Sequence, residues 1–182
     1  MSKTKEKSAV RGLAPFVITA AIAAAYTTPT FADPAKDIQV AGRALGFLEN
    51  SPSGHTVVAI IFDPSKPATV AQKDAIMAAL GSGLSAGSAT LVGKPVEFSA
   101  IGGVSGAGAI YATTGVPYAA VGAIGKAKKI VTISADKACA EAGHCVMSVV
   151  TSPSVEITVN RAAASAVGAA FKSAFRMMIH EI

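Results

Sequence analysis

Apolar and polar positions follow two different periods along residues 35–180. Apolar residues recur every three or four positions over 35–49, 67–80, 116–127 and 161–180, and this spacing predicts a helix in each segment. Short runs of apolar and β-branched residues predict strands at 56–62, 96–101, 109–112, 129–134, 145–150 and 155–159. Glycines interrupt the pattern at Gly81–Gly87 and Gly102–Gly108, where regular structure is costly.

The order of these elements predicts the fold class. Strands that alternate with helices are typical of an α/β sheet covered on both faces, and the wholly apolar run at 56–62 is typical of a strand buried on both sides. Turn residues at 152–154 join the last two strands into a hairpin. We therefore predict a mixed sheet, mostly parallel, with a C-terminal antiparallel hairpin and helices on both faces. Asn160 is a good N-cap for the closing helix, whose expected buried face consists of Ala164, Val167, Phe171, Ala174, Phe175 and Met178.

Residues 1–32 have the three parts of a secretory signal peptide. The first twelve residues are basic, residues 13–25 are apolar, and small residues at Thr30 and Ala32 suit cleavage before Asp33. The alternative is an uncleaved membrane anchor, although a stable span needs about 20 strongly apolar residues and this stretch is shorter and rich in alanine. We predict a cleaved leader over 1–32, export of the protein and a single α/β domain over 33–182.

The positive charge of the chain belongs largely to this leader. The whole chain has a formal net charge of +5, but four of its 16 basic residues and one of its 11 acidic residues lie in residues 1–32. What remains is nearly balanced, and its longest basic cluster is Lys126–Lys129. The charge therefore gives no argument for a nucleic-acid partner.

Cys139 and Cys145 are the two cysteines of the chain, and they enclose the short loop CAEAGHC. In an oxidising compartment a close, even pair predicts a disulfide. The alternative is a metal site that includes His144, but two thiols and one imidazole are too few well-spaced ligands for a closed zinc site. We predict the disulfide and no metal or cofactor.

Two glycine-containing segments resemble catalytic or phosphate-binding motifs. Gly83–Gly87 matches the hydrolase pattern G-x-S-x-G with Ser85 as its serine, but a predicted helix precedes it where that motif needs a strand. Gly102–Gly108 contains neither a P-loop nor a dinucleotide-binding fingerprint, and we interpret it as a surface turn. We assign no catalytic residues and expect no enzyme.

Ligand-binding candidates lie near the ends of predicted strands, where α/β folds often place binding groups. Asp63 directly follows the first strand, and Thr113 directly follows the strand at 109–112. Ser105 belongs to the glycine-rich segment between two strands. If the protein binds a small ligand, we expect these three residues to contribute to its pocket.

The C-terminal third has an order of elements found in a known family. The strand at 129–134 is followed by a loop ending in Gly143-His144-Cys145, by the predicted hairpin and by a helix that closes with Phe171-Lys-Ser-Ala-Phe175-Arg-Met-Met178. This order resembles the YfiR-like family of periplasmic proteins, in which a β-hairpin runs into an E-I-N-like strand end and a terminal helix. Glu156–Asn160 is the nearest match to that strand end, and Cys139 and Cys145 resemble the short-range disulfide of the family.

The resemblance implies a small, often dimeric periplasmic α/β protein without catalytic activity. The best-studied relatives restrain a membrane-bound diguanylate cyclase by contacting its periplasmic sensor region. We therefore hypothesise a periplasmic regulatory or interaction protein, with the periplasmic region of a membrane-bound sensor or cyclase as its partner and a homodimer as its assembly. The alternative hypotheses are a periplasmic small-ligand binding protein and, third, an enzyme that uses Ser85.

Overall fold

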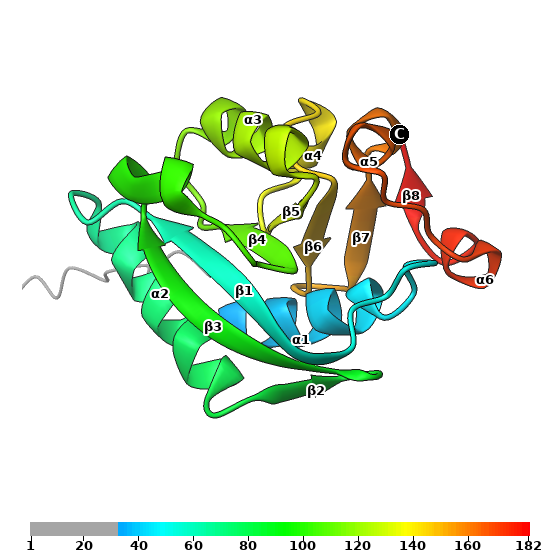
Figure 1. The fold of residues 1–182 in the computed structure, drawn as a ribbon, viewed down its shortest axis with the longest axis horizontal. Coiled ribbons are helices and arrows are strands. Elements are labelled where there is room, and N and C mark those ends of the chain that lie inside the picture. The colour runs from blue at the N-terminus through cyan, green and yellow to red at the C-terminus, as the bar shows by residue number, and fades with distance from the viewer. Residues whose placement is uncertain (1–32) are drawn as a thin grey trace, which may run out of the picture. The chain divides into compact units, whose positions relative to one another are not determined.

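Eight strands form one sheet in residues 33–182, the part of the chain that the computed structural model describes (Figure 1). Their order across the sheet is β2-β3-β1-β4-β5-β6-β7-β8. The strands are β1 Gly54–Phe62, β2 Leu84–Ala86, β3 Ala89–Glu97, β4 Ala109–Ala112, β5 Val131–Ser134, β6 Met147–Val150, β7 Glu156–Val159 and β8 His180–Glu181.

The directions of the strands confirm the fold class predicted from the sequence. The adjacent strands β3, β1, β4, β5 and β6 all run parallel. β7 pairs antiparallel with β6 as the C-terminal hairpin, and β8 pairs parallel with β7. At the other edge, the short strand β2 pairs antiparallel with β3. The sheet is therefore mixed and mostly parallel.

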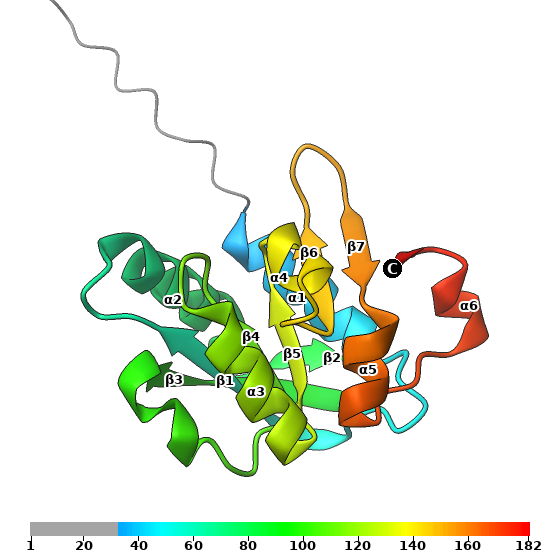
Figure 2. The same cartoon turned by 90° about the horizontal axis from the view of Figure 1, so that it is seen from above.

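Helices cover both faces of the sheet (Figure 2). The chain forms α1 Pro34–Leu45, α2 Pro67–Leu80, the 3₁₀ helix η1 Phe98–Gly103, α3 Tyr118–Lys128, α4 Lys137–Glu141, α5 Arg161–Val167 and α6 Ser173–Arg176. α1 and α2 pack together on one face, which we call the α1/α2 face. α3 and α5 pack together on the other, the α3 face, where η1 also lies.

Proline and polar caps determine where several helices begin. Pro34 and Pro67 occupy the first turns of α1 and α2, where the missing N–H removes no helical hydrogen bond. The Asp33 carboxylate accepts from Ala35 N at 3.1 Å and so caps α1. Asn160 Oδ1 accepts from Ala163 N at 2.9 Å, which confirms Asn160 as the N-cap of α5.

β1 is buried on both faces, as its apolar sequence predicts. Because side chains alternate along a strand, Val58 and Ile60 belong to the core on the α1/α2 face, whereas Ala59 and Ile61 belong to the core on the α3 face. Tyr111 of β4 is fully buried among the first set. β1 is thus the central strand whose side chains pack in the cores on both faces of the sheet.

The prediction of a strand at 96–101 is correct only for its first two residues, and the rest of β3 and all of β2 were missed. β3 ends at Glu97, and the chain leaves the sheet as η1. Gly93 and Pro95 hide β3 in the sequence pattern because neither is a strand former. Gly93 allows close packing, since a Cβ there would lie 2.6 Å from Met77 Sδ. Pro95 is tolerated because β2 pairs with β3 only as far as Leu91, so that the N–H side of Pro95 is an open edge.

The prediction of one closing helix over 161–180 is also wrong. α5 ends at Gly168, which adopts a left-handed φ of +75° that favours glycine, and the chain then forms α6 and β8. Phe171 and Phe175 are buried as expected, and the ring of Phe175 stacks on Phe47 at 4.9 Å between centroids. Met178, expected in the buried stripe, is 66% exposed, and Ala174 is exposed as well.

The predicted signal peptide over 1–32 lies outside the described residues. Within 33–182, none of the helices has both the length and the apolar character that crossing a membrane requires.

Candidate functional site

The structure does not bring the three predicted binding residues into one pocket. Asp63 follows β1 and Thr113 follows β4, so both lie at the carboxyl edge of the parallel strands. Ser105 lies between η1 and β4, on the α3 face. Close to it, Gly108 N donates to Val57 O at 2.9 Å, near the amino end of β1. The site must therefore be sought at two separate places.

The carboxyl edge between β1 and β4 is a topological switch point, a place where open α/β sheets bind ligands. β1 continues through α2 toward β3 on one side, and β4 continues through α3 to β5 on the other. Here Lys66 Nζ donates to Gly115 O at 2.7 Å, and Gln72 Oε1 accepts from Thr114 N at 2.6 Å. These bonds tie the loop after β4 to the start of α2, so the Lys66 and Gln72 side chains are engaged within the chain.

Asp63 and Thr113 both make structural hydrogen bonds. The buried Thr113 hydroxyl donates to Ile61 O at 2.8 Å. Asp63 Oδ1 accepts from Ser65 Oγ at 2.6 Å and from Ser65 N at 3.0 Å, and Asp63 Oδ2 lies 3.6 Å from Lys66 Nζ. The bonds from Ser65, with a smaller contribution from the Lys66 charge, lower the pKa of Asp63. An ionised Asp63 therefore stabilises the turn between β1 and α2.

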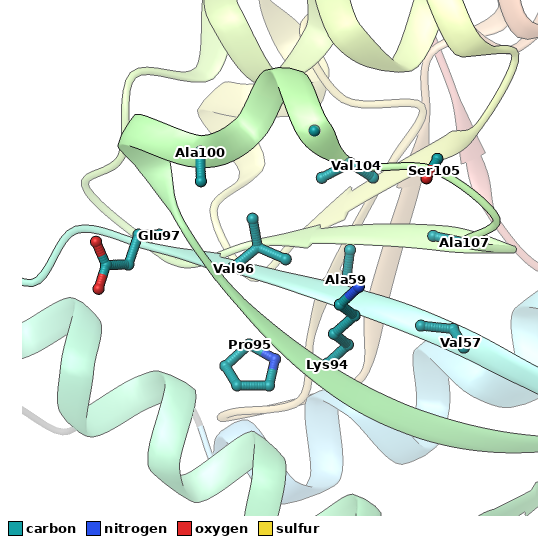
Figure 3. Close-up of a pocket in the computed structure, with 11 residues that line it drawn as sticks. Val57, Ala59, Lys94, Pro95, Val96, Glu97, Ala100, Val104, Ser105 and Ala107 are labelled. Carbon is teal, nitrogen blue, oxygen red and sulfur yellow. The ribbon is translucent and has the colours of Figure 1, made fainter.

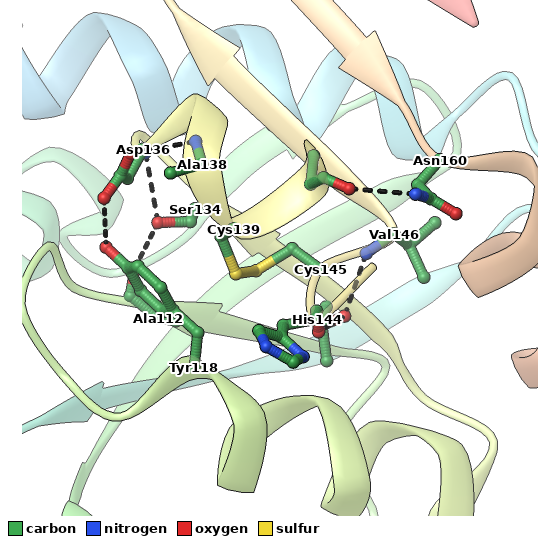
Figure 4. The surroundings of a disulfide bond; sticks show 12 residues. Ala112, Tyr118, Ser134, Asp136, Ala138, Cys139, His144, Cys145, Val146 and Asn160 are labelled. Atoms are coloured by element: carbon green, nitrogen blue, oxygen red, sulfur yellow. Dashed lines mark hydrogen bonds between the residues drawn. A yellow bond between two sulfur atoms is a disulfide. The ribbon is translucent and has the colours of Figure 1, made fainter. Parts of the chain in front are cut away.

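The disulfide and its neighbours occupy the next part of the α3 face (Figure 4). The structure joins Cys139 and Cys145, both fully buried, as the sequence predicts. α3 approaches this loop so closely that a Cβ on Gly122 would lie 2.6 Å from His144 O. Because the two sulfurs are bonded to each other, neither is a thiolate ligand for the metal site considered as the alternative.

Hydrogen bonds also satisfy the end of β5 beside this loop (Figure 4). Ser134 Oγ donates to Ala112 O at 3.0 Å and accepts from Asp136 N at 3.1 Å. The Tyr118 hydroxyl donates to Asp136 Oδ2 at 2.9 Å, and burial raises the pKa of Tyr118. Side-chain hydrogen bonds therefore link the carboxyl end of β4 to those of β1 and β5.

A pocket of about 330 Å³ lies on the α3 face, between the sheet and the connection from β3 to β4 (Figure 3). We call it the crossover pocket. Its floor comes from alternate residues of β1 and from the last residues of β3, and its roof comes from η1 and the loop that follows. The lining residues are Val57, Ala59, Lys94, Pro95, Val96, Glu97, Ala100, Gly103, Val104, Ser105 and Ala107.

The path of the chain explains why a pocket forms there. β1 lies between β3 and β4, so the connecting segment 98–108 has to cross over β1. This crossover is rich in glycine and alanine, and such small residues leave volume unfilled above Val57 and Ala59. At Gly108 the chain returns to the sheet, and a Cβ there would lie 2.4 Å from Thr56 Cγ2. The glycines of the crossover therefore permit both the pocket and, at Gly108, the close approach of the backbone to Thr56 of β1.

Three polar residues line the crossover pocket: Lys94, Glu97 and Ser105. Ser99 Oγ lies at a hydrogen-bonding distance of 3.5 Å from Glu97 Oε2. Among residues 33–182, the Lys94 ammonium group and the Ser105 hydroxyl make no hydrogen bond or ion pair. Of the three predicted binding residues, Ser105 is the one that lines an open pocket.

Sequence reasoning missed Lys94 because it missed β3. The helix and strand periods both fail over 89–97, and a lone lysine in an unassigned segment carries no signal. One observation could have identified Lys94. If the strand predicted at 96–101 is extended toward the N-terminus, Lys94 lies two positions before Val96 and therefore on the same face of the strand.

The segment that matches G-x-S-x-G forms a hairpin edge rather than a strand–turn–helix. Ser85 lies in β2 and pairs with Thr90 of β3. Gly83 and Gly87 flank it with φ values of +152° and +64°. The motif thus has a turn-forming role on each side of β2, and the strand-to-helix elbow that would expose a nucleophile is not formed at Ser85.

A second polar cluster lies buried on the α1/α2 face. Asp37 of α1 is fully buried, and its Oδ1 accepts from Thr151 Oγ at 2.7 Å. Within the described chain, Asp37 Oδ2 and the Tyr111 hydroxyl have no hydrogen-bond partner. Burial raises the pKa of Asp37, and burial together with the Asp37 charge raises the pKa of Tyr111. The cluster joins the first turn of α1 to the end of β6.

Comparisons with known proteins show the fold and leave the family open. No protein-family model and no curated protein sequence matches the chain. A conserved domain protein from Vibrio cholerae O1 biovar El Tor strain N16961 matches 82% of this chain and 60% of its own, with a TM-score of 0.61 and 10% identity. The ligand-free, open structure of CD0873, a substrate-binding protein with adhesive properties from Clostridium difficile, matches 70% of this chain and 54% of its own, with a TM-score of 0.53 and 15% identity. The chain thus spans little more than half the length of either structure.

We predict that replacing Cys139 and Cys145 together by alanine lowers the free energy of unfolding by about 2 kcal/mol, because the unfolded chain loses a closed loop. Urea unfolding followed by circular dichroism measures this. As a control, a reducing agent should destabilise the wild type by a similar amount and leave the double variant unchanged. Equal stabilities of the oxidised wild type and the variant would contradict the prediction.

Asp37 should make stability depend on pH. Its pKa in the folded protein lies above the ordinary value of 3.8, so folding favours the protonated form, and stability falls as the pH rises above 3.8. We therefore expect the difference in free energy of unfolding between the wild type and Asp37→Asn to shift against the wild type as the pH increases above 3.8. Thr151→Val removes a bond that lowers the pKa of Asp37 and should steepen the decrease. Urea unfolding at a series of pH values measures both, and parallel curves for wild type and Asp37→Asn would refute the prediction.

Proposed function

We propose that this protein is exported and binds a small ligand in the crossover pocket without catalysing a reaction. The observation that carries the proposal is the pocket itself, a hollow between the sheet and the short crossover. Its volume of about 330 Å³ lies within the range of small-ligand sites. Its lining is mainly apolar with three polar residues, which is the usual composition of such sites.

The likeness to CD0873 supports a binding role. That protein is a substrate-binding protein, and its fold resembles this one at 15% identity. A shared fold is an argument by analogy, because one fold serves many functions. The pocket adds an argument from this chain's own residues.

The chemistry of the lining favours binding over catalysis. A hydrolytic serine needs a base within hydrogen-bonding reach. Ser105 has no hydrogen bond to a base in the described chain, and the other ionisable lining residues are Lys94 and Glu97. Groups of three histidine, cysteine, aspartate or glutamate residues that could hold a metal ion are also absent from residues 33–182.

Export is supported by two independent features. Residues 1–32 have the composition of a secretory leader, and the Cys139–Cys145 disulfide suits an oxidising compartment such as the periplasm. A periplasmic location would also place the protein where small extracellular solutes first become available.

A ligand titration with a pocket-filling variant tests the proposal. We expect at least one of benzoate, benzamide and benzylamine to shift the amide NMR resonances of 57–59 and 100–107 in the oxidised protein. Ala100→Phe should weaken this binding about tenfold or more, because the added ring occupies the volume the ligand needs. Ala100 is exposed on η1, so the change should leave the fold intact.

Ser99→Phe provides the matched control. Ser99 is exposed on the same 3₁₀ helix but does not line the pocket. It should bind as the wild type does. The proposal fails if none of the compounds shifts the pocket resonances, or if Ala100→Phe and Ser99→Phe bind equally well.

A second candidate function is the regulatory role implied by the resemblance to the YfiR-like family. The observation that favours it is a set of exposed apolar side chains near the last strands: Val155 is 61% exposed, Met177 84% and Met178 66%. Exposed apolar side chains are enriched at protein interfaces, and methionine adapts to many partner surfaces. The partner predicted from the resemblance, a membrane-bound sensor or cyclase, stays a prediction, as does the homodimer.

Complementation tests this second function. If the protein restrains a cyclase, deletion of its gene should raise cellular cyclic-di-GMP, and the wild-type gene should restore the level. Met177→Glu with Met178→Glu should fail to restore it, because charges replace the apolar contact. Ala119→Glu, at an exposed position of α3, is the control and should restore it. An unchanged level on deletion would remove this candidate.

A further inference from the structure

We infer that the ligand of the crossover pocket is a small amphipathic carboxylate, whose apolar body lies on the sheet and whose carboxylate binds Lys94 and the loop at 105–107. The inference rests on the proposed function and names the ligand class for that site. Three features of the described residues carry it: an apolar floor, a lysine without a partner, and a series of unengaged N–H groups.

The floor and inner wall of the pocket are apolar. Ala59 of β1 and Val96 of β3 belong to the apolar cluster on the α3 face, and Val57 shares that face because it lies two positions from Ala59. Val104 closes the inner end and is 5% exposed, and Ala59 is 1% exposed. A ligand that is only an inorganic anion would leave these surfaces without a partner, so the ligand must have an apolar part.

Lys94 supplies a positive charge beside this floor. Lys94 shares a face of β3 with Val96, two positions away, and in Figure 3 its side chain is directed toward Ala59. The ion pairs in residues 33–182 use Lys36, Lys66, Lys73, Lys137 and Arg176 as cations. Lys94 belongs to none of them. An ammonium group next to a hollow of low polarity favours an anionic ligand group, and the bond between them is charge-assisted.

The loop at 105–107 offers further donors. Val104 N donates to Ile101 O at 3.1 Å, and Gly108 N donates to Val57 O at 2.9 Å. Between them, the N–H groups of Ser105, Gly106 and Ala107 donate to no group in the described chain. Gly106 turns the backbone with φ of +67°, a conformation that favours glycine. Lys94 and this loop together provide donors and no carboxylate, which suits an acceptor such as a carboxylate group.

Lys94 sets the orientation of the ligand. Glu97 lies three positions from Lys94 at the far end of the lining, and in Figure 3 its carboxylate points away from Lys94. Glu97 therefore does not neutralise the Lys94 ammonium group. The carboxylate of the ligand is expected at the Lys94 end, and its apolar body toward Val96 and Val104.

Paired ligands test the inference. Benzoate, phenylacetate and hexanoate, each compared with its neutral amide, are titrated into the oxidised protein and followed by NMR. We expect each acid to bind about tenfold more tightly than its amide, because only the acid gains the charge-assisted bond. Lys94→Met should remove this preference while leaving the amides unaffected, and Lys94→Arg should restore most of it.

Matched controls separate this inference from the proposed function. Lys128→Met removes an exposed lysine of α3 and should leave every affinity unchanged. If acids and amides bind equally and Lys94→Met has no effect, the ligand class is wrong while the pocket remains a binding site. If inorganic phosphate binds as tightly as benzoate, the apolar part of the inference is overturned. If neither acids nor amides shift the pocket resonances but benzylamine does, the ligand class fails and the proposed function stands. If benzylamine also leaves the resonances unchanged, both fail.

Discussion

The position of β1 between β3 and β4 is the constraint on which the rest of the structure depends. β1 pairs with β3 along its whole length, and on its other side it pairs with β4 over Val58–Ile61. Its side chains enter both cores. The chain must therefore cross one face of β1 to connect its two neighbours. It does so in eleven residues, 98–108, as a 3₁₀ helix and a glycine-rich loop. A segment of such small residues cannot cover the sheet as a helix of large apolar side chains would, and the crossover pocket is the result.

The same topology explains why we place the site on a face of the sheet. The carboxyl edge is where an α/β sheet ordinarily binds, but here side chains of the β1–α2 turn, α2 and α3 satisfy the loops at that edge. Lys66, Gln72 and Tyr118 are engaged with the chain itself. The crossover pocket differs in having donors that are not engaged. The likeness to a substrate-binding protein gives the fold, and the argument for a site comes from Lys94, Ser105 and the apolar floor.

Local signals in the sequence account for most of the fold. The apolar run of β1, the proline at the start of α2 and the Asn160 cap each predict their elements because the local preference agrees with the tertiary structure. The failures occur where tertiary packing overrides that preference. Gly93 and Pro95 hide β3, and the helical spacing of 161–180 continues through Gly168, where the backbone turns left-handed. The site was only partly predictable for the same reason: Ser105 was a candidate as part of a glycine-rich turn, whereas Lys94 lies in the strand that the pattern concealed.

The central claim is that a ligand occupies the space between β1 and the crossover. Intermolecular nuclear Overhauser effects between benzoate and a protein with labelled alanine methyl groups locate it most directly. The account predicts contacts from the ring protons to the methyl groups of Ala59 and Ala107, which line the pocket. Contacts to Ala135, which follows β5 at the carboxyl edge, without contacts to Ala59 or Ala107, would contradict it.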